Sequence, residues 1–216
     1  MKPLFIEAKK KFKDENINLK LLNELKGKTI SLAATIQYID LIPKVKTYLE
    51  KQGKKVIIKQ GAHHEAHVLG CNSSALDKSA DTILIITDGK FHAINNAIQI
   101  QKEIYIFDTE NLTKIKKKEI ELHKKKTLAK KKIFLSINTV GLLISTKPGQ
   151  KNKTIEQIRK KIEKLKKKVY IFEGDTINPT ELENFPQIKI WVNTSCPGLA
   201  LDDKRIINLA DILEFL

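Results

Sequence analysis

The stretch DTILIITDGKFHAINNAIQIQ, residues 81–101, decides the fold class. Its first part, residues 81–89, is a nearly continuous run of apolar and β-branched residues, too apolar for a strand at an exposed antiparallel edge. Residues 91–101 predict a helix, and Asp88-Gly89 lies at the turn between the two. A buried strand followed at once by a helix is typical of a parallel sheet whose two faces are covered.

The segments on either side repeat this alternation. Strands are predicted at residues 29–35, 54–61 and 103–109. A helix is predicted at residues 43–53, with Pro43 in its first turn and Gly53 at its end. Strands that alternate with helices at these lengths predict right-handed βαβ units. We therefore expect an α/β fold.

The pattern then starts again after residue 139. A strand and turn at 140–150, an amphipathic helix at 154–168, a strand at 168–174 and a strand at 188–198 follow in the same order. We predict two tandem, related three-layer α/β domains with mainly parallel sheets, at residues 28–130 and 131–216. A basic helix around residues 113–132 joins them.

Lysine dominates the charge of the chain. Lys and Arg total 40 against 25 Asp and Glu, which gives a formal net charge of +15, and the only arginines are Arg159 and Arg205. Few arginines favour solvated lysine-rich helix faces over a dedicated nucleic-acid surface, although an acidic protein or RNA partner stays open. No apolar run is long enough to span a membrane and no signal peptide is apparent, so we expect a cytoplasmic protein without a membrane partner.

The two cysteines, Cys71 and Cys196, lie far apart in the sequence and form no CxxC motif. In a reducing compartment a structural disulfide is not expected. Cys196, Asp88-Gly89 and residues 147–150 follow predicted strands, and Cys71 lies in a loop that leads to one. Because ligands bind at the carboxyl ends of parallel strands, we expect these segments to converge on one cleft between the domains.

Other motifs are weaker. Residues 61–70, GAHHEAHVLG, resemble the HExxH helix of metalloproteases only superficially, because His67 follows Glu65 too closely; a polar loop is the better interpretation. The common nucleotide-binding loops are absent from the sequence. The turn at 147–150 suits a carboxylate or another anion. Asp202-Asp203 is explained either as helix capping or as a site for an amine or sulfonium.

Five stretches, taken in chain order, resemble a known family. They are TIQYIDLIPKVKTYLEKQG, HVLGCN, DGKFHAINNAI, STKPGQ and NTSCPGLALDD. Together they resemble the archaeal diphthamide synthase radical subunits, the 2-(3-amino-3-carboxypropyl)histidine synthases, from about residue 28 to residue 216.

This resemblance implies a fold, a cofactor and a reaction. Family members have three similar α/β domains around a 4Fe-4S cluster, and each domain supplies one cysteine. The open iron binds the substrate S-adenosylmethionine. Cleavage of this substrate gives a 3-amino-3-carboxypropyl radical, which adds to a histidine of translation elongation factor 2. Three thiolates that leave one iron open fit this chemistry.

The resemblance also assigns residues. Cys71 and Cys196 match the metal-binding cysteines of the second and third family domains, and His92 matches a residue of the cofactor pocket or radical acceptor site. The positions that match cofactor-binding residues are Asp88, Gly89, His92, Lys147, Gly149, Gln150, Asp202 and Asp203.

The chain also departs from the family pattern. The first domain and its cysteine are missing, and residues 1–27 resemble only that domain's closing strand and a linker. Gly198 stands where family members commonly carry arginine. We therefore expect an enzyme that acts in a complex, with the third cysteine from a separate chain or a homodimer, and with an electron donor. The alternatives are a non-catalytic or electron-transfer subunit, a degenerate relative whose cysteines are structural, and a basic RNA-binding module without a cluster.

Overall fold

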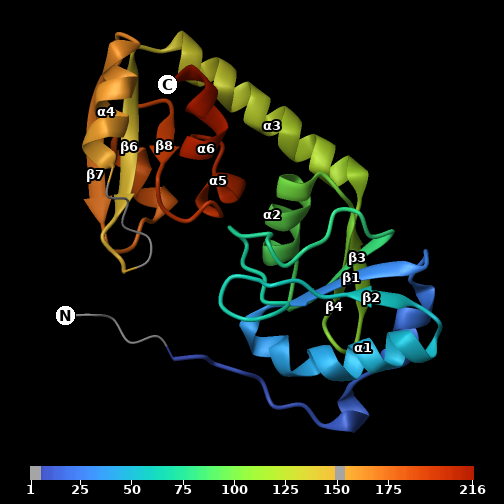
Figure 1. Cartoon of the computed structure of the whole chain (residues 1–216). Helices are drawn as coiled ribbons and strands as arrows, with labels where there is room; N and C mark the ends of the chain where they lie inside the picture. The colour runs from blue at the N-terminus through green and yellow to red at the C-terminus, as the bar shows by residue number, and fades with distance from the viewer. Residues whose placement is uncertain (1–5, 149–153) are drawn as a thin grey trace. The chain divides into compact units, whose positions relative to one another are not determined.

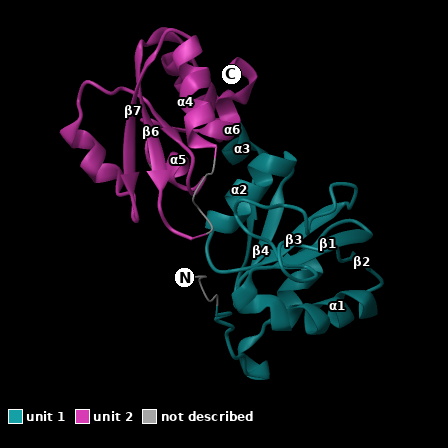
Figure 2. Ribbon diagram, turned by 60° about the vertical axis from the view of Figure 1, so that its left-hand side comes forward, with its two compact units in different colours: residues 1–121 teal, residues 122–216 magenta. Residues whose placement is uncertain are grey.

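The chain forms two compact units, Met1–Glu121 and Leu122–Leu216 (Figure 2). A computed structural model describes residues 6–148 and 154–216. Each unit is an α/β layer structure around its own sheet, which confirms the predicted fold class. The units divide inside the long helix α3, Lys117–Ser136, whereas the sequence placed the boundary further along the same helix.

The sheet of the first unit has the strand order β2-β1-β3-β4-β5. Its strands are β1 Thr29–Ala34, β2 Lys55–Ile57, β3 Thr82–Ile86, β4 Ile104–Phe107 and β5 Leu112–Ile115. All neighbours pair in parallel except β4 and β5, which are antiparallel. Strand β3 lies in the middle and is buried along its whole length, as its apolar sequence predicts.

Helices cover both faces of this sheet (Figure 1). Helix α1, Ile42–Lys51, packs Val45 and Leu49 against Leu32 and Leu84 of β1 and β3. Helix α2, Phe91–Ile100, follows β3 and has buried alanine and isoleucine side chains along one face. Three 3₁₀ helices complete the unit, at Asp14–Asn16, Leu19–Glu24 and Ile36–Leu41.

The second unit repeats the strand order of the first. Its sheet runs β7-β6-β8-β9, so that in both units the first strand is central, the second is at the edge, and the third and fourth follow on the other side. All neighbours are parallel. The strands are β6 Thr139–Ser145, β7 Lys168–Gly174, β8 Trp191–Asn193 and β9 Ile206–Asn208. The internal repeat predicted from the sequence is therefore present in the topology.

Two apolar clusters cover the two faces of the second sheet. Helix α4, Ile155–Lys164, contributes to one together with Phe134 of α3. The other surrounds Trp191, whose ring lies directly over Gly141 of β6. The remaining helices are α5 Leu199–Asp202, α6 Leu209–Ile212 and the 3₁₀ helices Pro179–Asn184 and Leu213–Phe215.

The segment before β1 differs from the expected strand. Residues 6–13 form no strand, and no neighbouring strand lies beside them among the described residues. This N-terminal segment is instead held by side chains: Lys9 pairs with Asp40 at 3.1 Å and Lys10 with Asp88 at 2.6 Å. The ring of Phe12 also packs against the buried Tyr38, with 5.2 Å between the ring centroids, and this contact attaches the segment to the core.

Candidate functional site

The first part of the candidate site is the turn that carries Cys71. Leu69 and Asn72 exchange backbone hydrogen bonds of 3.2 and 3.1 Å, so that Gly70 and Cys71 form the corner of a tight reverse turn. The Cys71 side chain is exposed at this corner and forms no disulfide. The thiol is thus accessible to a ligand from outside the unit.

Two amide side chains of α2 hold this turn. Asn96 is fully buried and its Nδ2 donates to the carbonyl of Leu69 at 2.9 Å, while Gln99 Nε2 donates to the carbonyl of Gly70 at 2.8 Å. A Cβ added at Gly70 would lie at ordinary van der Waals distance from Phe91, His92 and Asn95 of α2. The position of Cys71 is therefore fixed by the helix that follows β3.

The turn lies at the carboxyl edge of the first sheet. His67, just before it, bridges to Ala34, the last residue of β1, and α2 begins where β3 has ended. In parallel sheets this edge is where ligands gather. The Cys71 turn therefore lies at the edge of the first sheet where β1 and β3 end.

The DGKFH segment lies at the same edge. Gly89 has a φ of +59°, a left-handed conformation that glycine adopts without a steric penalty. Asp88 is exposed, and its carboxylate accepts a hydrogen bond from Lys10, which also donates to the hydroxyl of Tyr38 at 2.8 Å. His92 is half-buried on the first turn of α2, and burial lowers its pKa, which favours the neutral imidazole.

The second part of the candidate site is a cavity of about 150 Å³ in the second unit. Cys196, Lys147 and Ser145 line it, together with Asp175, Thr176, Ile177, Ser195 and Leu199. Ser145 ends β6 and Cys196 follows β8, so this cavity also lies at a carboxyl edge. The Ser195 hydroxyl is buried and has no hydrogen-bond partner among the described residues.

A buried asparagine also holds the Cys196 loop. Asn193 Nδ2 donates to the carbonyl of Cys196 at 2.8 Å and to Oδ1 of Asn208 at 2.7 Å, and its own Oδ1 accepts from the Ser195 amide at 2.9 Å. Asn208 donates in turn to the carbonyl of Pro197 at 3.2 Å. Each cysteine loop is thus fastened to its unit by a buried amide side chain.

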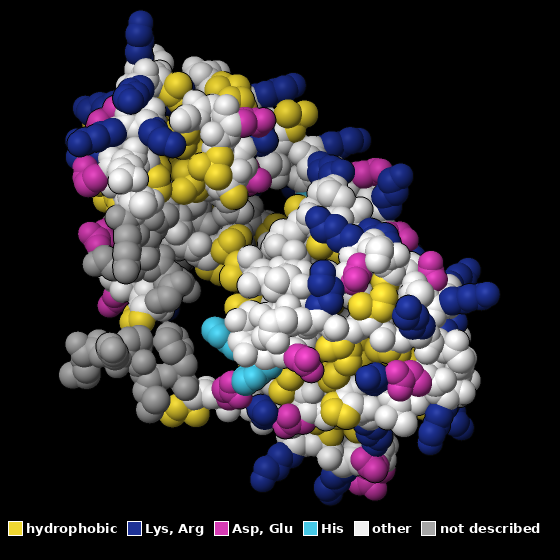
Figure 3. Space-filling model, in the orientation of Figure 1, with side chains coloured by type: hydrophobic (Ala, Val, Ile, Leu, Met, Phe, Trp, Pro, Cys, Tyr) yellow, Lys and Arg dark blue, Asp and Glu magenta, His cyan; other side chains and the backbone are white. Residues whose placement is uncertain are grey.

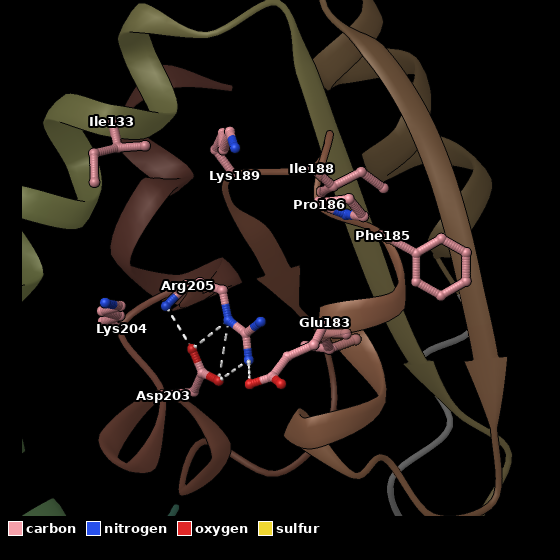
Figure 4. A pocket seen from close by; sticks show the side chains of 10 residues that line it. Ile133, Glu183, Phe185, Pro186, Ile188, Lys189, Asp203, Lys204 and Arg205 are labelled. Carbon is pink, nitrogen blue, oxygen red and sulfur yellow. Dashed lines mark hydrogen bonds and ion pairs between the residues drawn. The ribbon is translucent and has the colours of Figure 1, made fainter.

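Asp203 lies in a different place from Cys196. Its carboxylate accepts from Nε and Nη2 of Arg205, at 3.1 and 2.6 Å, and this guanidinium lowers the pKa of the carboxyl (Figure 4). Both side chains line an open hollow of about 910 Å³ with Glu183 and Phe185, whereas Asp203 is not among the residues that line the Cys196 cavity. Asp203 follows the end of α5, and its side-chain contacts are with Arg205, so they show an ion pair and no helix cap.

The side chains of three expected site residues are not described. Gly149 and Gln150 lie outside the described residues, and of Asp202 only the backbone, the end of α5, is described. The convergence of Cys71 and Cys196 on a single cleft stays a prediction, because the two units are described separately.

The sequence reasoning missed the residues that hold the cysteine loops. Asn96 and Asn193 are buried polar side chains, and Lys10 is the partner of Asp88. A signal existed for Asn96, because an Asn-Asn pair inside an otherwise apolar helix needs hydrogen-bond partners when it is buried.

The donor chemistry suits an iron-sulfur cluster in part. Thiolates are its usual ligands, the Cys71 side chain is exposed, and the Cys196 side chain is half-buried. The Ser195 hydroxyl beside Cys196 has no partner within the described part of the chain. The chain has only two cysteines, however, so it supplies at most two of three thiolates. Within the described residues, no group of three or more His, Cys, Asp or Glu side chains stands ready to hold a metal ion.

Comparison with known proteins decides the family. A family model described as "Putative diphthamide synthesis protein" matches residues 1–206. The chain belongs to the diphthamide synthesis protein family. A 2-(3-amino-3-carboxypropyl)histidine synthase of Methanocaldococcus jannaschii is 31% identical over 94% of this chain, and one of Pyrococcus horikoshii is 27% identical over 82%.

Solved structures of the family agree with this fold. The crystal structure of Dph2 from Pyrococcus horikoshii matches with a TM-score of 0.79 and 25% identity, covering 92% of this chain and 60% of that one. A second structure of Dph2, with a 4Fe-4S cluster, matches with a TM-score of 0.76 and 26% identity over 88% of this chain and 57% of that one. The chain spans about half the length of its curated relatives, 57% of the M. jannaschii protein and 52% of the P. horikoshii protein.

No described helix is long and apolar enough to cross a bilayer.

Proposed function

We propose that this chain is part of a radical diphthamide synthase that transfers the 3-amino-3-carboxypropyl group of S-adenosylmethionine to a histidine of elongation factor 2, in the cytoplasm. One observation carries the proposal. Each of the two repeated units presents a cysteine on a loop at the carboxyl edge of its sheet, held by a buried asparagine. Family membership and the curated names of the relatives support the same reaction class.

The proposed metal ligands are Cys71 and Cys196. Bound to three thiolates, a 4Fe-4S cluster supplies the electron that breaks a carbon-sulfur bond of S-adenosylmethionine. This chain's contribution is to hold two of the thiolates in place, through Asn96 and Asn193. We propose that the third thiolate comes from a separate chain that carries a further cysteine domain of this family, or from a homodimer, and that an external donor provides the electron.

The other site residues have proposed roles in binding. Lys147 lines the Cys196 cavity and is suited to the carboxylate of the methionine group. Gly149 and Gln150, which lie outside the described residues, are proposed to bind the same group. Asp88, Gly89 and His92 are proposed to bind the substrate from the first unit, where the neutral His92 ring can accept a proton or a hydrogen bond. Asp202 and Asp203 are proposed to face the cationic part of the substrate, and the contact with Arg205 limits Asp203 to a positioning role.

The test is iron content in the assembled complex. The chain is purified without oxygen from its native cells with its associated polypeptides, reconstituted with iron and sulfide, and assayed for iron and for labelled transfer from S-adenosylmethionine to elongation factor 2. We expect Cys71→Ala and Cys196→Ala each to remove most of the iron and the transfer activity. Ser73→Ala, in the loop that follows the Cys71 turn, is the matched control and should change neither.

Unchanged iron in Cys71→Ala would contradict ligation by this residue. Full iron and full activity in the isolated chain would contradict the need for a third thiolate from another chain. Salt-dependent RNA binding by an iron-free chain, without transfer in any assembly, would favour the RNA-binding alternative.

A further inference from the structure

Three of the five histidines lie in one compact loop, residues 61–67, which we call the imidazole loop. The ring centroids of His63 and His67 are 5.5 Å apart, and those of His64 and His67 are 5.9 Å apart. His63 and His64 are exposed, whereas His67 is buried. Figure 3 shows histidine side chains close together on the surface of the first unit, beside acidic atoms.

The backbone of the imidazole loop is tightly fixed. The amides of Gly61 and Ala62 donate to the carbonyls of His64 and His67, at 3.0 and 2.9 Å. A Cβ on Gly61 would stand 2.0 Å from the His67 carbonyl oxygen, so that only glycine allows the loop to close here. The loop is also joined to β1, since Ala34 donates to the carbonyl of Ala66 at 2.8 Å. The three imidazoles are therefore carried on a preorganised support.

His67 is the unusual member of this group. Its side chain is 3% exposed, and neither ring nitrogen has a hydrogen-bond partner among the described residues. A buried polar group without a hydrogen-bond partner costs about 1–3 kcal/mol, so a ligand that binds a His67 ring nitrogen would recover this free energy. Burial, followed by the neighbouring His63 and His64, lowers the pKa of His67, and the neutral ring is the form that coordinates metals.

A carboxylate completes the group. Glu7 of the N-terminal segment pairs with Nε2 of His64, and this contact lowers the pKa of Glu7. Lys9 also lies within 4.0 Å of Glu7. Three imidazoles and one carboxylate thus come together from segments that lie 56 or more positions apart in the sequence. The proposed reaction uses none of these four side chains.

We propose that His63, His64 and His67, with Glu7, form a binding site for a divalent first-row transition ion such as Zn²⁺. In the conformations shown, the described residues hold no ready-made group of metal ligands, so binding requires rotation of the exposed His63 and His64 side chains toward His67. Zn–N bonds of about 2.1 Å in tetrahedral geometry place ring centroids roughly 5 Å apart. The observed centroid separations of the His63–His67 and His64–His67 pairs lie within about 1 Å of this value. Rotation of the side chains is enough to close this difference.

The proposal is tested with zinc alone. The full chain, without a histidine tag and with both cysteines changed to serine, is treated with a chelator and titrated with Zn²⁺ by calorimetry, and bound zinc is counted after gel filtration. Removing the thiolates makes the result independent of any iron-sulfur cluster. We expect one zinc per chain with a Kd of about 1 μM or below.

Matched variants locate the site. His63→Gln and His67→Gln should each weaken zinc binding at least about tenfold, whereas His123→Gln, which removes an imidazole from α3, should not. His63 is exposed, so its variant is expected to fold, and far-ultraviolet circular dichroism checks both. Absence of zinc binding, retention of full affinity in His63→Gln, or an equal loss in His123→Gln would overturn the proposal.

Discussion

Replacing Asn96 with alanine should release the Cys71 turn from α2. The substitution removes the donor to the Leu69 carbonyl, a bond of 2.9 Å made by a side chain with no exposed surface. A buried acceptor left without its donor costs about 1–3 kcal/mol, which corresponds to a roughly 5- to 150-fold increase in local opening of the turn. Loss of the bond to the His92 carbonyl at 2.8 Å adds to the same effect.

Hydrogen exchange measures this opening directly. The amides of Leu69 and Asn72 are the donors that close the turn, so their exchange should accelerate by the factor given above. Asn95→Ala is the matched control, because Asn95 Nδ2 donates only to the Phe91 carbonyl of its own helix, at 3.1 Å. If Asn96→Ala leaves the exchange of residues 69–72 unchanged, or if Asn95→Ala accelerates it equally, then the amide does not hold the turn. In the assembled enzyme Asn96→Ala should also reduce iron content, with Cys71 itself intact.

Two further predictions concern the second unit. Gly141→Ala places a Cβ 2.0 Å from the Trp191 ring and should lower the free energy of unfolding by at least about 1–3 kcal/mol. Urea unfolding followed by the fluorescence of this single tryptophan measures the change. Gly174→Ala is the control and should lower stability much less, because its Cβ would come no closer than 3.7 Å to any surrounding atom. For Asp203 the pKa is lowered by Arg205, so its contribution to stability is complete above its ordinary pKa and is lost as the pH falls through the lowered value. In Asp203→Asn the free energy of unfolding, measured by urea titration, should therefore fall less as the pH is lowered below about 4 than in the unchanged chain. An equal fall in both proteins would show that the ion pair with Arg205 does not contribute to stability.

Long buried strands were predictable from sequence because burial on both faces leaves a continuous apolar run. Strand β3 and the strand β6 gave this signal, and both lie in the middle of their sheets. Strands β5 and β9 were missed, and the basic helix expected from residue 113 begins only at Lys117, after β5 has ended. Residues 74–80 form turns and no helix, since the side chain of Asp77 accepts from the amide of Ser79 at 2.8 Å and competes with helical hydrogen bonds.

The candidate site was predictable to a similar extent. The position of Cys196 at a sheet edge follows from the strand that precedes it, which the sequence shows, whereas for Cys71 the sequence predicted only a loop that leads to a strand. The supports of these cysteines did not follow, because Asn96 and Asn193 act through contacts between segments distant in the chain. The partner of Asp203 lies only two residues away, yet a carboxylate facing Arg205 and one facing a substrate have the same sequence pattern.

Before Phe12, the N-terminal segment lies on the first unit partly through charged contacts between exposed side chains. Its pairs with Asp40 and Asp88 are of the kind that contribute at most about 1 kcal/mol each and weaken as the Debye length shortens from about 8 Å at physiological salt to about 3 Å at 1 M. Molar sodium chloride should therefore let trypsin cut after Lys9 or Lys10 while the sheets stay resistant. On a gel, we expect a slightly shortened polypeptide that appears only in concentrated salt and is not degraded further.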